Sequence, residues 1–159
     1  MTSDVVLRGG LVVDGTGSPA RRADVAIRGG RIAEVGETVT GTGTEIDVSG
    51  LVVSPGFIDL HSHADFSVFD APEAVTQVAQ GVTTLVTGNC GFSPFPISPD
   101  HKDDLLGHRL LAGEASWEWS TAGEYAAAVE ALPLGVNLAL QVGHGALRIA
   151  AMGLADRPP

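Results

Sequence analysis

Three short apolar segments constrain the fold of this chain more than any other feature, because helix signals separate them. Residues 57–63 (FIDLHSH), 82–89 (VTTLVTGN) and 136–145 (VNLALQVGHG) each have the composition of a buried strand. Alternation of strand and helix is typical of parallel βαβ units, which build either a barrel or a doubly wound sheet. Both architectures gather their functional groups at the carboxyl ends of the strands. The sequence therefore predicts an α/β fold with its chemistry at HSH, GNCG and VGHG.

Two helices are expected between these strands. The first covers residues 70–81, with Asp70 as the cap, Gly81 as the stop and Val75, Val78 and Ala79 on its buried face. The second covers residues 118–132 and begins in a capping box formed by Ser120 or Thr121 with Glu124. Between the second strand and this helix, residues 98–116 are expected to form an acidic, partly helical excursion, after which Trp117 and Trp119 pack as core aromatics.

The N-terminal fifty residues have the alternation of β-structure. The segments DVVLRGGLVVDG (4–15) and ADVAIRGGRIAEVG (23–36) each place two apolar runs around Arg-Gly-Gly. This near-repeat predicts two consecutive hairpins, and residues 37–50 add a turn and one more short strand.

Composition limits the classes of partner. With 44% apolar and 18% charged residues the chain is that of a globular protein, and 19 acidic against 9 basic residues give a net charge of −10. This charge repels nucleic acid and anionic membranes, so neither is an expected partner. A single cysteine cannot form an internal disulfide, and no secretory signal or membrane-spanning run is evident, so we expect a cytoplasmic protein.

His61 and His63 are the first candidates for chemistry. Two positions apart on a strand, their side chains point to the same side and can reach one metal ion. At the end of an apolar strand both rings should be buried, and buried imidazoles need partners. Asp59 and Asp65 are candidates for carboxylates that orient these rings, although capping and turn roles are equally compatible with the sequence.

Cys90, the only cysteine, allows three interpretations: an inert core thiol, a nucleophile or a metal ligand. A nucleophile needs an imidazole base, for which His144 is the extra candidate. If Cys90 and the histidine pair share one sheet edge, their nitrogen and sulfur donors favour zinc over magnesium or calcium. His144 itself either binds substrate, acts as an outer donor, or is exposed in a tight turn between Gly143 and Gly145.

The segments that carry these residues resemble a known family. PGFIDLHSHAD (55–65) is similar to the first-strand metal motif of the amidohydrolase superfamily, and GVTTLVTGNCGFSPFP (81–96) with NLALQVGHGALR (137–148) resembles the N-acyl-D-amino-acid deacylases, or D-aminoacylases. The resemblance implies an incomplete metal-dependent-hydrolase (β/α)8 barrel of about three strands over residues 55–159. A small N-terminal β-sandwich portion over residues 1–54 would precede it.

The same resemblance implies zinc-dependent hydrolysis of the amide bond of N-acyl-D-amino acids, which are small molecules, to a carboxylate and a free D-amino acid. It assigns metal ligation to His61, His63 and Cys90. Asp65 and His144 would bind substrate or support the ligands. The catalytic aspartate is expected beyond the C-terminus, so none of the residues present is assigned that role.

A complete barrel needs about 250 residues. We therefore expect the chain to be the N-terminal portion of an enzyme, inactive alone and able to self-associate through unpaired sheet edges. Two alternatives stay open: another amidohydrolase, such as a dihydropyrimidinase- or hydantoinase-like enzyme or a deaminase, and a non-catalytic binding module. The sequence also leaves open whether the substrate side chain is neutral, D-Asp-like or D-Glu-like.

Overall fold

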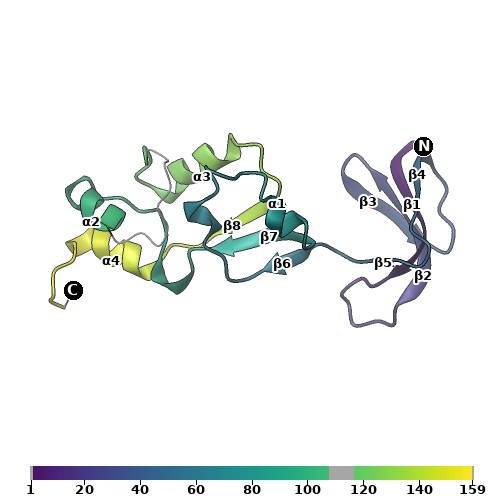
Figure 1. The fold of residues 1–159 in the computed structure, drawn as a ribbon, viewed down its shortest axis with the longest axis horizontal. Coiled ribbons are helices and arrows are strands. Elements are labelled where there is room, and N and C mark those ends of the chain that lie inside the picture. The colour runs from purple at the N-terminus through teal and green to yellow at the C-terminus, as the bar shows by residue number, and fades with distance from the viewer. Residues whose placement is uncertain (1, 108–116, 159) are drawn as a thin grey trace. The chain divides into compact units, whose positions relative to one another are not determined.

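The computed structural model describes residues 2–107 and 117–158 and divides into two compact units, Met1–Pro55 and Gly56–Pro159 (Figure 1). The sequence interpretation placed the division after residue 54. The last part of the predicted acidic excursion, residues 108–116, lies outside the described residues.

The N-terminal unit is a single five-stranded sheet. Its strands are β1 (Thr2–Val12), β2 (Arg21–Arg28), β3 (Arg31–Gly36), β4 (Thr42–Asp47) and β5 (Val52–Val53). The order is β3-β2-β1-β4, and β5 also pairs with β1. Contacts with β2 are antiparallel, whereas β4 and β5 run parallel to β1. Apolar residues on β1 and β2 supply most of its core: Val6, Val12, Ala23, Val25 and Ala26, with Val39 from the β3–β4 connection.

Only one of the two Arg-Gly-Gly sequences forms the predicted hairpin turn. Gly29 and Gly30, both at positive φ, connect β2 to β3 as expected. The prediction for the first sequence is wrong: β1 continues through Arg8, Gly9 and Gly10, and its register with β2 shifts there as in a β-bulge. The carboxylate of Asp24 keeps this segment in the sheet, because it accepts hydrogen bonds from the Gly9 amide (2.9 Å) and the Arg8 guanidinium (2.8 Å).

The second unit contains a parallel sheet in the order β6-β7-β8, as the strand and helix alternation predicted. Its strands are β6 (Phe57–Asp59), β7 (Val82–Thr87) and β8 (Asn137–Leu140). The described residues form this open sheet and no closed barrel, so the partial barrel stays a prediction.

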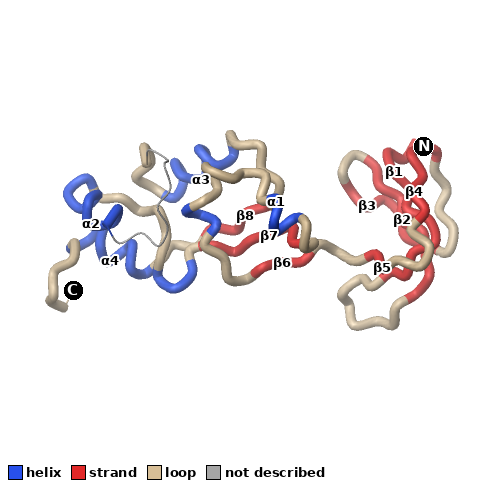
Figure 2. Tube along the Cα trace, in the orientation of Figure 1, coloured by secondary structure: helices blue, strands red, loops and turns tan. Residues whose placement is uncertain are grey.

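Among the described residues, four α-helices accompany the sheet: α1 (Val75–Val78), α2 (Lys102–Gly107), α3 (Ala122–Glu130) and α4 (His144–Met152). Figure 2 shows them in blue together with the short 3-10 helices. Helix α3 begins after Thr121 with the predicted capping box, in which Thr121 and Glu124 each accept a backbone N–H. Residues 98–107 contain α2 and the short 3-10 helix Pro99–His101, as expected for that excursion. Helix α4 was not predicted, since VGHG was interpreted as the end of a strand.

The prediction for residues 70–81 is wrong in extent. Helix α1 has one turn, and its N-cap is Ala74 in the left-handed region (φ 45°) instead of Asp70. Val75 and Val78 are exposed, at 70% and 47%, so they do not form a buried face. A helix could not begin at Asp70 because the chain turns at Ala74, and the remaining residues before Gly81 allow only one turn.

The core of this unit lies among the helices and the loops that follow β6 and β7. Aromatic side chains make up much of this core. Trp117 and Trp119 are buried in it, as expected. The same cluster contains Phe66, Phe95 and Tyr125, and the aliphatic residues Leu105 and Ile149. Trp119 donates its indole N–H to the Pro94 carbonyl at 2.7 Å.

Within the described ranges, no helix has the length and apolar character needed to cross a bilayer.

Candidate metal centre

The histidine pair follows β6 and does not lie on it, so the strand predicted over residues 57–63 is too long. The strand ends at Asp59, whose carboxylate accepts the His61 amide at 3.0 Å in a turn, and His63 is already the N-cap of the 3-10 helix Ala64–Phe66. The expectation that both rings are buried is also wrong, because His61 is exposed and His63 is half-buried. A bond from the Ser62 amide to the Val86 carbonyl (3.0 Å) holds this segment beside β7.

Cys90 lies in a tight turn directly after β7. Gly88 and Gly91 on either side both have φ of 82°, and Cys90 itself has φ of 57°. The thiol is free and exposed, so the inert core interpretation is wrong. Because β6 and β7 are parallel, the Cys90 turn and the histidine pair emerge at the same edge of the sheet.

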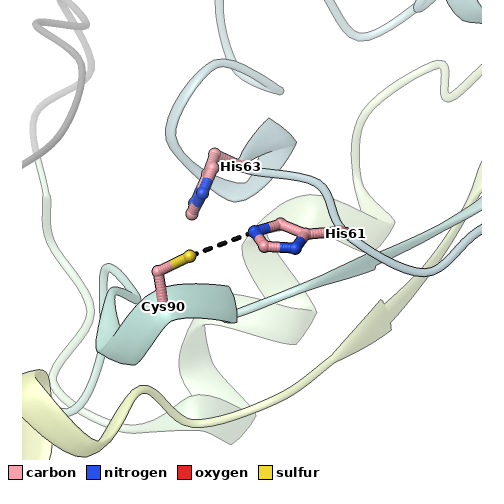
Figure 3. A group of neighbouring side chains, drawn as sticks. All are labelled: His61, His63 and Cys90. Atoms are coloured by element: carbon pink, nitrogen blue, oxygen red, sulfur yellow. Dashed lines mark hydrogen bonds between the residues drawn. The ribbon is translucent and has the colours of Figure 1, made fainter.

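The three side chains converge at this edge (Figure 3). The Nε2 atom of His61 lies 3.0 Å from the Sγ atom of Cys90, and one ligand atom from each of His61, His63 and Cys90 falls within 4.8 Å of the others. The two imidazole rings meet edge to face with centroids 5.6 Å apart. The base candidate that the sequence proposed for a nucleophilic Cys90 was His144, but the imidazole beside the thiol is that of His61.

This donor set fits a zinc ion. Bonds of about 2.0–2.3 Å to a tetrahedral zinc keep ligand atoms roughly 3.5 Å apart. The ligand atoms of the three side chains lie within 4.8 Å of one another, and one pair is 3.0 Å apart. Two imidazoles and a thiolate are borderline-soft ligands, which suit zinc better than magnesium or calcium. In addition, the Nδ1 atom of His63 is buried and has no hydrogen-bond partner within the structure. A polar atom in that state is available to a ligand or an ion.

Asp65 stands behind this centre and contacts the Cys90 turn instead of the imidazoles. Its side chain is buried (1% exposed), and Oδ2 accepts the Gly88 amide at 3.1 Å. Burial raises the pKa of this carboxyl to about 7, above its ordinary value of 3.8. The second oxygen, Oδ1, is buried and has no hydrogen-bond partner among the described residues.

His144 is exposed as the first residue of α4 and does not belong to the three-residue cluster. Its flanking glycines allow the start of α4 to approach the Cys90 turn. A Cβ atom on Gly143 or Gly145 would lie 2.5 Å or 2.8 Å from the Gly91 carbonyl oxygen. The Gly143 amide also donates to the buried hydroxyl of Ser93 at 3.0 Å. The sequence interpretation offered a tight turn as one reason for these glycines, and their close approach to Gly91 is a further reason.

Sequence reasoning missed the polar residues that join these elements. Asn89, Ser93 and Tyr125 make hydrogen bonds to Ser62, Gly143 and Asp65, which lie 27, 50 and 60 positions away in the chain. Only Asn89 carried a signal, as an amide side chain directly before the cysteine.

Comparison with known proteins assigns the class. The model of the amidohydrolase family matches residues 44–158, and the chain belongs to this family. It is 43% identical to the D-aminoacylase of Alcaligenes xylosoxydans xylosoxydans over 94% of the chain and 31% of that protein. It is 40% identical to the N-acyl-D-aspartate deacylase of the same organism, over 94% of the chain and 30% of that protein.

A solved structure gives the same result. The N-acyl-D-glutamate deacylase of Bordetella bronchiseptica, complexed with zinc and a phosphonate inhibitor, matches with a TM-score of 0.81 and 38% identity. The match covers 96% of this chain and 32% of that one, so the chain spans about a third of the length of these relatives. The resemblance to the N-acyl-D-amino-acid deacylases predicted from the sequence is confirmed.

Proposed function

We propose that this chain contributes His61, His63 and Cys90 to the zinc centre of a hydrolase that cleaves the amide bond of N-acyl-D-amino acids. The observation that carries the proposal is the convergence of these three ligand atoms within 4.8 Å, in a chain that belongs to the amidohydrolase family. The substrate class is taken from the relatives named as deacylases of this kind. The zinc in the complex with the Bordetella enzyme supports the choice of metal.

Bound zinc supplies a Lewis acid that polarises an amide carbonyl and activates water for attack. The residues of this chain hold and orient that centre. Cys90 contributes a thiolate, and His61 and His63 contribute neutral imidazoles from the neighbouring segment. Asp65 supports the turn that carries Cys90, through its bond with the Gly88 amide. We assign substrate contact to His144, which is exposed where α4 begins against that turn.

Hydrolysis also needs a group that takes and returns a proton, and in the part of the chain that the structure describes no carboxylate joins the three-residue cluster. We therefore propose that the 159-residue chain binds zinc but does not turn over substrate alone. Self-association through the outer strands β6 and β8 and a cytoplasmic location stay predictions.

Calorimetric titration of the metal-free chain with zinc tests the proposal. We expect one zinc to bind the wild-type chain, and Cys90→Ser to weaken that binding strongly. His101→Ala is the matched control, because His101 pairs with Asp104 and lies outside the cluster. Failure of the wild-type chain to bind zinc, or equal binding by Cys90→Ser, would overturn the ligand assignment. Clear deacylase turnover by the zinc-loaded chain would overturn its proposed inactivity.

A second candidate is hydrolysis of cyclic amides. The chain is 33% identical to the D-hydantoinase of Rhizobium radiobacter over 77% of its length and 25% of that enzyme. Deacylases match at higher identity over more of the chain, which favours the first proposal. Cleavage of hydantoin, and not of N-acetyl-D-amino acids, by a protein that contains this segment would favour cyclic-amide hydrolysis over the deacylase proposal.

A further inference from the structure

Asn89 connects the Cys90 turn to the histidine pair. Its amide nitrogen Nδ2 donates one hydrogen bond to the Ser62 carbonyl at 3.3 Å and another to the Val86 carbonyl at 2.8 Å. Ser62 is the residue between His61 and His63, and Val86 belongs to the strand that leads into the cysteine turn. A single side-chain amide therefore holds both halves of the cluster.

The turn needs such a restraint because of the backbone conformation of Cys90. At φ 57° and ψ 19° it occupies the left-handed region, which is unfavourable for any residue with a Cβ atom. Conformations of this kind persist only when the surrounding structure fixes them. Here the restraints come from the two Asn89 bonds, from the Gly88 amide bound to Asp65, and from the Phe92 amide bound to the Asn89 carbonyl at 2.9 Å.

We propose that Asn89 is a positioning residue, which sets the Sγ atom of Cys90 at its distance from the two imidazoles before a metal ion arrives. The inference rests on the proposed function of the three ligands and deepens it, because it names the group that arranges them. Asparagine suits the role because its NH2 group has two donors on one atom, and two carbonyl oxygens face it. An alanine here would lose both bonds, so the Ser62 segment would keep its own amide bond to the Val86 carbonyl (3.0 Å) but lose this link to the cysteine turn.

The test compares zinc affinity in two asparagine variants of the 159-residue chain. Asn89→Ala should weaken zinc binding 10- to 100-fold, the usual effect of removing a group that orients metal ligands. Asn137→Ala is the matched control, because the Asn137 amide also donates to a β7 carbonyl, that of Thr83 at 3.0 Å, but at the start of the strands. That control should bind zinc as the wild type does.

A second readout separates positioning from general stability. Cobalt substituted for zinc gives a near-ultraviolet absorption band only when a thiolate is bound, and its intensity reports how well Cys90 engages the metal. We expect a weakened or shifted band in Asn89→Ala and an unchanged band in Asn137→Ala. The melting temperatures of the metal-free variants, measured by circular dichroism, give the general loss of stability with which the change in the cobalt band is compared.

The outcomes distinguish the two proposals. If the wild-type chain binds no zinc, the proposed function fails and the inference fails with it. If Cys90→Ser loses zinc while Asn89→Ala retains wild-type affinity and cobalt spectrum, only the role of Asn89 is overturned. Equal losses in Asn89→Ala and Asn137→Ala would also overturn it. Where Asn89→Ala does not fold, Asn89→Ser, which keeps one donor, takes its place and must also weaken binding.

Discussion

The hydroxyl of Tyr125 donates a 2.9 Å hydrogen bond to the backbone carbonyl of Asp65, 60 positions earlier in the chain. This contact joins α3 to the segment that carries the histidine pair, and both partners are buried. Burial raises the pKa of the Tyr125 hydroxyl above its ordinary value, so the group stays protonated and remains a donor. The aromatic core thus supports the segment of the candidate metal centre through a specific hydrogen bond as well as through packing.

Tyr125→Phe should destabilise the chain by about 1–3 kcal/mol, because it keeps the ring but leaves a buried carbonyl without that partner. Urea unfolding followed by tryptophan fluorescence measures the loss, since Trp119 contacts Tyr125 with ring centroids 5.1 Å apart. A free energy of unfolding equal to that of the wild type would contradict the importance of this bond.

Gly143→Ala should destabilise the chain by about 1–3 kcal/mol, because the new Cβ atom would lie 2.5 Å from the Gly91 carbonyl and force α4 and the Cys90 turn apart. Gly107→Ala is the control, since a Cβ atom there meets nothing within 4 Å. Thermal unfolding by calorimetry compares the two. Equal melting temperatures for both variants would show that the close approach is unimportant.

Cys90→Gly should make the metal-free chain more stable than Cys90→Ala by about 1 kcal/mol, because only glycine adopts φ 57° without a steric cost. Both variants lose the thiol, so a difference in metal binding does not enter the comparison. Chemical denaturation of the two metal-free proteins measures it. A more stable alanine variant would mean that the turn relaxes out of the left-handed region.

Asp24 should titrate at unusually low pH. The hydrogen bond from Arg8, followed by that from the Gly9 amide, lowers the pKa of this carboxyl below its ordinary value. The charged form therefore stabilises the N-terminal sheet above about pH 4, and this contribution is lost as the pH falls through the lowered pKa. The NMR shift of the Gly9 amide proton, which is bonded to Asp24 at 2.9 Å, reports the titration directly.

Asp24→Asn should abolish that titration and destabilise the sheet at neutral pH by about 2 kcal/mol. A midpoint for Asp24 at or above the ordinary aspartate value would refute the assignment.

Patterns among neighbouring residues predicted several helices and strands. The capping box of Ser120 or Thr121 with Glu124 predicted the start of α3, and the β-branched run predicted the strand β7. The prediction that this strand is buried is only partly right, because Leu85 and Thr87 are buried and its other residues are partly or fully exposed. The Arg-Gly-Gly sequences show the limit of this reasoning. A turn and a bulge use the same glycine pair, and the choice at Gly9 depends on Asp24, 15 positions further along.

The sequence predicted which residues form the candidate site, but not how the fold brings them together. His61, His63 and Cys90 do converge, although the argument relied on alternation along a strand that ends at Asp59. The groups that bring them together act across long separations, as the bond of Asn89 to Ser62 does, and no sequence spacing encodes such bonds. At His144 the sequence showed the two flanking glycines, but it did not predict that α4 begins there and packs against Gly91.

The left-handed backbone at Cys90 has a consequence for protein engineering. The direction of the thiol is set by the main chain of the turn, and the glycines at 88, 91, 143 and 145 permit that main-chain path. Copying His-x-His and a cysteine onto another scaffold would transfer three side chains without the left-handed backbone conformation that sets the direction of the thiol. A functional graft would have to include the Cys90 turn, Asn89 before it, and the start of α4 with Gly143 and Gly145.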